Sequence, residues 1–136
     1  MRGQRAHILF RLNQRQEALA QMSAAVEGLE RLPPRDTAWG LASSRILLGR
    51  MLSDTGHPAD AEPTLAASLA ALEQLGATPP RRAEAVCELA RARLLQKPRN
   101  EEWQRLRECL AIYRSWGLAE PQVVASLERL LKDSPF

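Results

Sequence analysis

The same pattern of side chains occurs three times along this chain, first 43 and then 41 residues apart. Large apolar residues recur at four positions of the pattern, a small residue recurs among them, and another small residue recurs upstream. The matched sets are Met22, Leu65 and Leu106; Val26, Leu69 and Leu110; Leu29, Leu72 and Tyr113; Leu32, Leu75 and Trp116; Ala25, Ser68 and Cys109; and Ala6, Gly49 and Ala90. A period of about 20–50 residues is typical of a stacked array of small helical units.

The composition favours helices throughout. The chain has 21 alanines and 22 leucines, whereas valine, isoleucine and threonine together number 11. Alanine and leucine lose little in a helix, and β-branched residues lose χ1 freedom there. No segment alternates strictly between apolar and polar residues over six positions. We therefore expect an all-α protein without strands.

Proline, glycine and capping residues divide the chain into seven expected helices. These span about 3–13, 16–32, 37–55, 59–75, 79–96, 100–116 and 120–132. The first six form three pairs, in repeats of about 3–33, 36–76 and 79–117, within a single domain of residues 1–136. The seventh has one apolar and one polar side, as a helix that caps such an array requires.

The second unit carries the clearest family motif. Its residues Leu48, Gly49, Leu52, Gly56, Ala61, Leu65, Ser68 and Leu69 fall at the spacing of the tetratricopeptide repeat (TPR), which this unit resembles. The third unit departs from that motif at Arg93, Lys97 and Glu102. HEAT and armadillo repeats have a similar length, but the small residues here fall at the TPR packing positions. The 41–43-residue units look like the long-helix type of kinesin light chain.

The resemblance covers residues 3–117 and implies a right-handed superhelical solenoid of three helix pairs plus a C-terminal capping helix. The ending from Leu110 to Pro121 also resembles the C-terminus of bacterial serine/threonine kinases that carry such repeats. That second resemblance implies a regulatory or docking segment of a larger bacterial signalling protein.

No motif for catalysis or for a cofactor is present. The sequence has no Gly-rich phosphate loop, no GxSxG and no HExxH. We expect Cys87 and Cys109 to be two reduced thiols in the core, and no metal site, because the histidines are far from them in sequence. We therefore expect a protein that is not an enzyme and has no cofactor. Without a long apolar stretch or a signal-peptide pattern, we expect a cytoplasmic location and no membrane partner.

The TPR resemblance implies that the first helix of each pair lines a concave groove that binds a peptide or partner protein. The groove-facing positions carry over to His7, Phe10, Arg11, Ser43, Ile46, Arg50, Ser53, Asp54, Glu84, Cys87, Arg91, Leu94 and Leu95. His7, Arg50 and Arg91 fall at the same position of successive repeats. The pattern therefore predicts a cationic line, that is, a row of these three side chains along the groove, which suits an acidic or phosphorylated peptide. The alternative is a solvated face of mixed charge.

Two other functions stay open. Ile8, Leu9 and Leu12 form an apolar flank of the first helix, which predicts a homodimer through that helix. Nucleic-acid binding is the most distant alternative, because the net charge is only +3 and the signs are interspersed. We expect the tryptophans to serve packing: Trp116 in the core, and Trp39 and Trp103 half-buried with the indole N–H in water.

Overall fold

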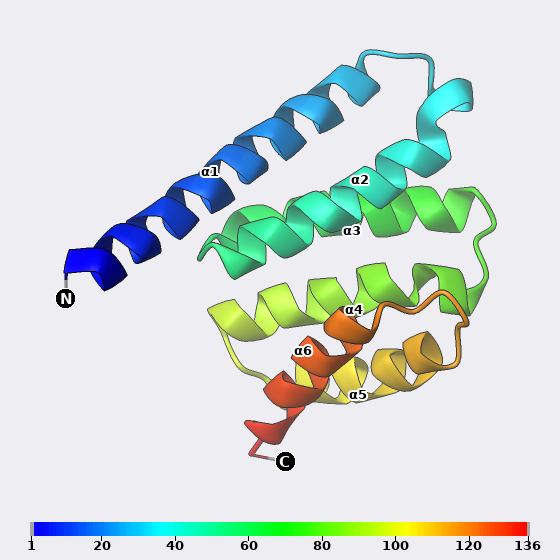
Figure 1. Cartoon of the computed structure of the whole chain (residues 1–136). Helices are drawn as coiled ribbons and strands as arrows, with labels where there is room; N and C mark the ends of the chain where they lie inside the picture. The colour runs from blue at the N-terminus through cyan, green and yellow to red at the C-terminus, as the bar shows by residue number, and fades with distance from the viewer. Residues whose placement is uncertain (1, 136) are drawn as a thin grey trace.

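The computed structural model describes residues 2–135 of the chain and, within them, the side chains of residues 13–135. That part of the chain contains six helices and no strand, so the expected all-α class is confirmed. The helices are α1 (Arg2–Glu30), α2 (Pro34–Asp54), α3 (Pro58–Gln74), α4 (Pro79–Gln96), α5 (Asn100–Arg114) and α6 (Pro121–Lys132), as Figure 1 shows.

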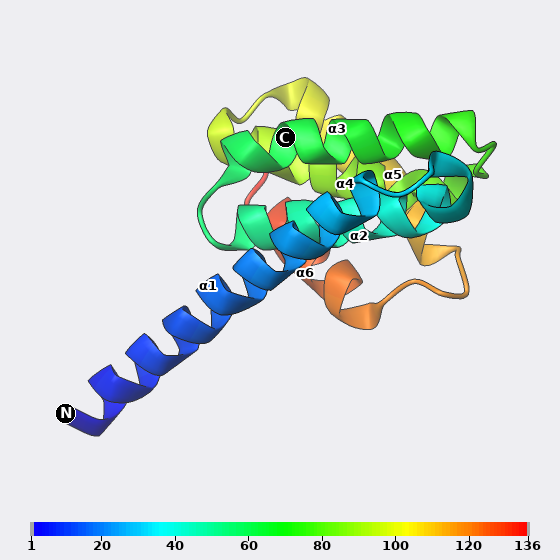
Figure 2. The same cartoon turned by 90° about the horizontal axis from the view of Figure 1, so that it is seen from above.

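α1 is one continuous helix where the sequence predicted two. The expected break at Asn13 and Gln14 is wrong, because the segment between Asn13 and Gln16 contains no glycine or proline, and glutamine and arginine are good helix formers. The first unit is therefore a single helix, and the described residues form six helices instead of seven. α1 packs on α2, and Figures 1 and 2 show it extending beyond the other helices.

The other helix ends follow the sequence signals. Gly56 and Gly76 come just after α2 and α3 and have φ values of +83° and +73°, which glycine adopts without the steric penalty of a Cβ. The N–H of the residue after each glycine donates back to the helix, from His57 to Leu52 at 2.7 Å and from Ala77 to Leu72 at 3.0 Å. A proline occupies the first turn of four helices, where its missing N–H has no intrahelical partner.

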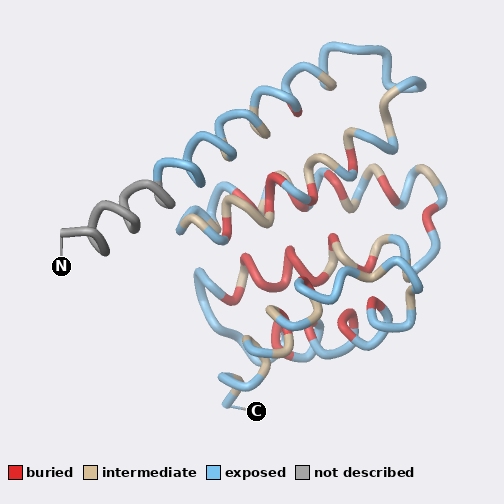
Figure 3. The backbone as a smooth tube through the Cα atoms, viewed as in Figure 1, coloured by how far each residue is buried: buried red, intermediate tan, exposed pale blue. Residues whose placement is uncertain are grey.

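The middle of the molecule consists of two antiparallel helix pairs. α2 pairs with α3 and α4 pairs with α5, while both α2 and α3 contact α4. Matched positions of the two pairs are buried to a similar degree. Leu65 and Leu106 are both fully buried, Tyr113 is also fully buried, and Leu72 is almost fully buried. Figure 3 shows that the buried residues gather along the facing sides of these four helices, whereas the described side chains of α1, from Asn13 onward, are mostly exposed.

α6 packs its predicted apolar side against the second pair. Val123 and Leu127 are buried in one cluster with residues of α4 and α5, and Val124, Leu130 and Leu131 pack against its edge. The polar side of α6 faces away from that cluster, as the sequence predicted.

A disulfide joins Cys87 of α4 to Cys109 of α5, so the expectation of two reduced core thiols is wrong. The two Cα atoms lie 5.6 Å apart, within the range that a disulfide spans. Cys109 holds the small-residue position of the repeat, which faces the first helix of its own pair. The equivalent Ser68 of α3 also faces the first helix of its own pair. It donates a hydrogen bond to the carbonyl oxygen of Ala42 in α2, at 2.8 Å. The disulfide removes one ground for expecting a reducing compartment.

Two of the three tryptophans pack much as predicted, although Trp116 is only partly buried, at the edge of the core and not inside it. Trp116 packs against the core beside Tyr113, with ring centroids 6.4 Å apart. Trp39 is partly exposed, and the guanidinium of Arg81 lies 3.9 Å from the centroid of its ring. Trp103 differs, because it is only 5% exposed in the core between α4, α5 and α6. Its indole Nε1 has no hydrogen-bond acceptor among the described residues.

Candidate functional site

A cleft of about 670 Å³ lies between α2, α4 and the segment that connects α5 to α6. We call it the α2–α4 cleft. Four of the predicted groove residues line it: Ser43, Ile46, Arg50 and Glu84. Most of the remaining lining comes from Leu47, Leu72, Arg81, Trp116, Leu118 and Glu120. The structure thus brings the middle of the predicted groove together with a wall that the repeat pattern did not predict.

That wall is the connection from Ser115 to Glu120, and Tyr113 holds it in place. The backbone N–H of Glu120 donates to the hydroxyl oxygen of Tyr113 at 2.9 Å, and Tyr113 itself is fully buried in the core. The N–H of Ala119 donates to the carbonyl oxygen of Trp116 at 3.0 Å. These bonds position Glu120, whose side chain reaches Arg50 of α2.

Arg50 forms ion pairs with two carboxylates that line the cleft. Its Nη1 lies 3.6 Å from Oε1 of Glu84 in α4 and 3.7 Å from Oε2 of Glu120. Burial raises the pKa of Glu84 above its ordinary value of 4.5, Arg50 opposes that rise, and the charges of Glu120 and Glu88 add to it. Burial therefore outweighs Arg50 in setting the protonation of Glu84.

Arg91 is buried, and it ties α4 to the end of α2. Its Nε donates to Oε2 of Glu88 at 2.9 Å, and its Nη2 lies 2.9 Å from Oδ1 of Asp54. Nη2 also donates to the carbonyl oxygen of Arg50 at 3.2 Å. Glu88 is almost fully buried, and this burial raises its pKa although Arg91 opposes the rise. These groups form a polar tie between α2 and α4 in which Arg91 and Glu88 are buried and Asp54 is about half exposed. None of the three side chains lines the cleft.

The remaining predicted groove residues lie elsewhere. Ser53 and Leu94 are buried, and Leu94 belongs to the core between α4, α5 and α6. Leu95 is exposed near the end of α4 but does not line the cleft. The predicted residues His7, Phe10 and Arg11 have side chains outside the described part of the chain, as do Ile8, Leu9 and Leu12, on which the homodimer prediction depends.

Sequence reasoning missed Leu47, Leu118 and Glu120. The repeat pattern places Ser115 and Trp116 at the end of the sixth expected helix and Glu120 at the start of the seventh, and so it predicts no groove residue there. One signal was present: Leu118 is a large apolar residue in a short connection between Gly117 and the proline that begins α6. An apolar side chain in a connection that should be solvated indicates either packing or binding.

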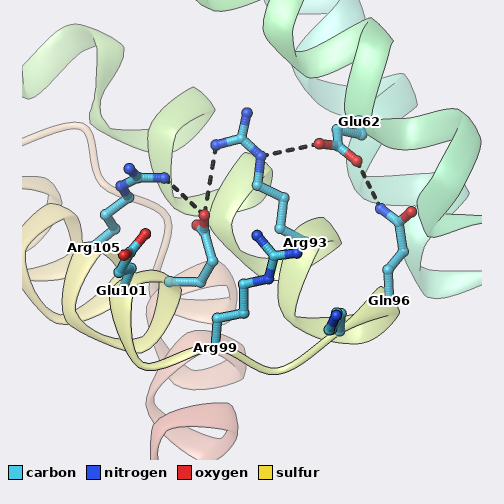
Figure 4. A pocket seen from close by; sticks show the side chains of 8 residues that line it. Glu62, Arg93, Gln96, Arg99, Glu101 and Arg105 are labelled. Atoms are coloured by element: carbon cyan, nitrogen blue, oxygen red, sulfur yellow. Dashed lines mark hydrogen bonds and ion pairs between the residues drawn. The ribbon is translucent and has the colours of Figure 1, made fainter.

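A second, more polar pocket of about 540 Å³ lies where α3, α4 and α5 meet (Figure 4). Arg93 bridges two carboxylates there: its Nε donates to Glu62 at 3.1 Å, and its Nη1 lies 3.8 Å from Glu102. Gln96 donates to Glu62 at 2.9 Å, and Arg105 donates to Glu102 at 2.7 Å. The hydrogen bond from Gln96 is the largest cause that lowers the pKa of Glu62, and the hydrogen bond from Arg93 is the next.

Arg93 and Arg105 pair with Glu62 and Glu102 across three helices, although Oε2 of the largely buried Glu102 accepts no hydrogen bond from the described residues. We therefore assign them to packing and take the α2–α4 cleft as the candidate site.

Within the described residues, no group of three His, Cys, Asp or Glu side chains could hold a metal ion. His57 lies in the turn after α2, where its Nδ1 is 3.2 Å from Oγ1 of Thr55. Nor is any helix of that part of the chain long and apolar enough to cross a membrane.

Comparison of this chain with protein-family models, with curated proteins and with solved structures found no match. The geometry of the cleft therefore carries the functional argument by itself.

Proposed function

We propose that this chain is a TPR-type helical-repeat module without catalytic activity, and that its α2–α4 cleft binds a segment of a partner protein. In this proposal the pairs α2–α3 and α4–α5 are two successive turns of a short solenoid, α6 closes it, and α1 adds a single helix to its other end. The resemblance of the chain's ending adds that the module serves as a docking segment of a larger bacterial signalling protein.

Equivalent contacts in the two pairs support the repeat part of the proposal. In both pairs, the small residue of the second helix contacts the first helix. Ser68 donates a hydrogen bond to Ala42 in one pair, and Cys109 is bonded to Cys87 in the other. Gly49 and Ala90, which also match, are both buried. A stack of equivalent units buries its apolar faces between neighbours and leaves a continuous surface for a partner.

The observation that carries the binding proposal is the exposure of large apolar side chains inside a concave site. Leu118 is 74% exposed and Leu47 is 37% exposed, and both line the α2–α4 cleft. Ile46, Leu72 and Trp116 line the same space. Binding sites are typically concave and mostly apolar, with a few placed polar groups, and burying Leu118 and Leu47 against a partner would remove apolar surface from water.

Selection of peptides from a random display library on the immobilised protein tests this proposal. We expect enriched peptides to lose binding to the variant Leu47→Glu/Leu118→Glu, because the added carboxylates make the apolar wall polar. The same peptides should bind Leu95→Glu normally, since Leu95 is an exposed leucine outside the cleft. Unchanged circular dichroism of both variants would show that folding is intact. Peptides that bind all three proteins equally would contradict a role for the cleft.

A further inference from the structure

Neither arginine of the predicted cationic line offers an unmatched positive charge. Arg50 has carboxylates of Glu84 and Glu120 within 3.6 and 3.7 Å. Arg91 is buried and has the carboxylates of Glu88 and Asp54 each within 2.9 Å. A carboxylate or phosphate on a ligand could reach Arg50 only by lying beside Glu84 and Glu120, where like charges repel it.

The balance of charge around the two arginines is negative. Each guanidinium faces two carboxylates, but only Arg50 with Glu84 and Glu120 lines the cleft. The other cation of the lining, Arg81, stacks on the ring of Trp39 at 3.9 Å, so the two carboxylates of the lining share one guanidinium. Arg81 lies one helical turn before Glu84 on α4, and no ion pair joins these two among the described residues. The side of the cleft formed by Glu84 and Glu120 is therefore the side that attracts a cation.

The two carboxylates also lack hydrogen-bond donors. Their distances to Arg50, 3.6 and 3.7 Å, exceed hydrogen-bond length, and no other described residue donates to either carboxylate. An ionised carboxylate can accept about four hydrogen bonds, and Glu84 is largely removed from the water that would otherwise supply them. A guanidinium or ammonium group of a ligand would supply donors and positive charge together.

Apolar surface lies beside these carboxylates. Leu118 comes two residues before Glu120 in the same connection, and Leu47 comes three residues before Arg50 on α2. Both leucines are exposed and line the same space as Glu84 and Glu120. A ligand cation held between the carboxylates would place its neighbouring side chains against these leucines.

We propose that the segment bound in the α2–α4 cleft carries an arginine or lysine flanked by aliphatic side chains, with the cation between Glu84 and Glu120. This inference rests on the proposed function and replaces the acidic peptide that the sequence predicted. In this arrangement Arg50 competes with the ligand cation for the two carboxylates.

NMR titration of the ¹⁵N-labelled chain of residues 1–136 with two short synthetic peptides tests the proposal. One peptide has an arginine between two leucines, and the other has a glutamate in its place. We expect the arginine peptide to shift the amide signals of the cleft and to bind at least about tenfold more tightly than the glutamate peptide. Glu84→Gln with Glu120→Gln should weaken it about tenfold, and Arg50→Gln should strengthen it, because the competing cation is removed.

Matched variants from the polar pocket control for net charge. Glu62→Gln with Glu101→Gln removes two negative charges and Arg99→Gln removes one positive charge, the same charge changes as in the cleft variants but at residues outside the cleft. These controls should leave the affinity within about twofold. Tighter binding of the glutamate peptide, or weaker binding of the arginine peptide to Arg50→Gln, would overturn the inference. Display-selected peptides that need Leu47 and Leu118 but carry acidic residues would overturn it and leave the proposed function standing. The absence of any cleft-binding peptide would defeat both.

Discussion

The side chain of Leu65 in α3 occupies the space that a Cβ on Gly49 of α2 would need. A Cβ added to Gly49 would lie 2.9 Å from Leu65 Cδ1 and closer still to Cγ and Cδ2. We predict that Gly49→Ala lowers the free energy of unfolding by about 1–2 kcal/mol, because overpacking of a core costs about 1–3 kcal/mol and the higher helix propensity of alanine returns up to about 1 kcal/mol. Urea denaturation followed by circular dichroism measures this change.

Gly40 provides the matched control in the same helix. It is exposed, and a Cβ added there would meet nothing within 4 Å. Gly40→Ala should therefore raise the free energy of unfolding by up to about 1 kcal/mol through helix propensity alone. Equal stabilisation by both substitutions would show that α2 and α3 are not as close at Gly49 as described.

The Gly49–Leu65 contact shows what the repeat pattern could predict. The repeat pattern predicted small residues at the points where neighbouring helices approach each other. Proline and glycine residues predicted the ends of α2, α3, α4 and α6. The same pattern failed for α1, because phase alone cannot distinguish two helices from one when no glycine or proline separates them. The segment from Asn13 to Gln16 contains neither, and the continuous helix forms.

The Cys87–Cys109 disulfide leads to a second prediction. The bonded residues are 22 apart in sequence, and closing a loop of that length removes chain entropy from the unfolded state worth about 3 kcal/mol. The double variant Cys87→Ala/Cys109→Ala should lose about that much free energy of unfolding. The wild-type protein in the presence of a reductant should unfold at the same urea concentration as the variant.

Thiol titration of the unfolded protein checks the bond directly. Without reductant we expect no reaction of either cysteine in guanidinium, and with reductant we expect both to react. Two reactive thiols in the untreated protein would restore the prediction made from sequence. The sequence placed both cysteines correctly on buried helix faces, but whether two small buried residues touch depends on the distance between α4 and α5, which periodicity does not encode.

Loss of Arg91 should be among the most destabilising single substitutions on the cleft side of α4. Arg91→Met leaves Glu88 almost fully buried without its cationic partner, and breaking a buried ion pair in this way costs about 3–5 kcal/mol. Adding Glu88→Leu to Arg91→Met should recover part of that loss, because the unpaired carboxylate is then gone. Denaturation of the single and double variants measures the recovery.

Arg114 offers the exposed counterpart. Its Nη2 lies 2.7 Å from Oε1 of Glu128, and both side chains are largely open to solvent. Arg114→Met should therefore change the free energy of unfolding by no more than about 1 kcal/mol. If Arg91→Met had an equally small effect, the tie between α2 and α4 would contribute little to stability.

These charge pairs also mark the limit of the site prediction. Arg50 and Arg91 were identified correctly as sharing a phase, but their partners Glu120 and Asp54 lie 70 and 37 residues away in sequence. Which carboxylates reach a long arginine side chain depends on how the helices cross and on the path of the connection after α5. The repeat therefore predicted that the two arginines are equivalent in sequence, but not that both are already paired, nor that Arg91 lies outside the lining of the cleft.

Glu84 makes stability depend on pH in a direction opposite to that of most ion-paired carboxylates. Burial raises its pKa above 4.5 in the folded protein, so the folded state favours the protonated form. The stabilisation from protonated Glu84 is fully present below pH 4.5 and is lost as the pH rises through the raised folded pKa. Glutamine mimics the protonated form and does not titrate.

We therefore predict that Glu84→Gln gains stability relative to the wild type as the pH rises from 4.5 to neutrality. Glu62→Gln is the matched control with the opposite sign. Hydrogen bonds from Gln96 and Arg93 lower the pKa of Glu62, so its contribution is present above pH 4.5 and is lost as the pH falls through the lowered value. Glu62→Gln should thus lose stability relative to the wild type as the pH rises from the lowered pKa of Glu62 to 4.5, and the difference should stay constant from there to neutrality. Urea denaturation at several pH values measures both differences, and a constant difference between Glu84→Gln and the wild type would show that Glu84 is solvated like an ordinary surface carboxylate.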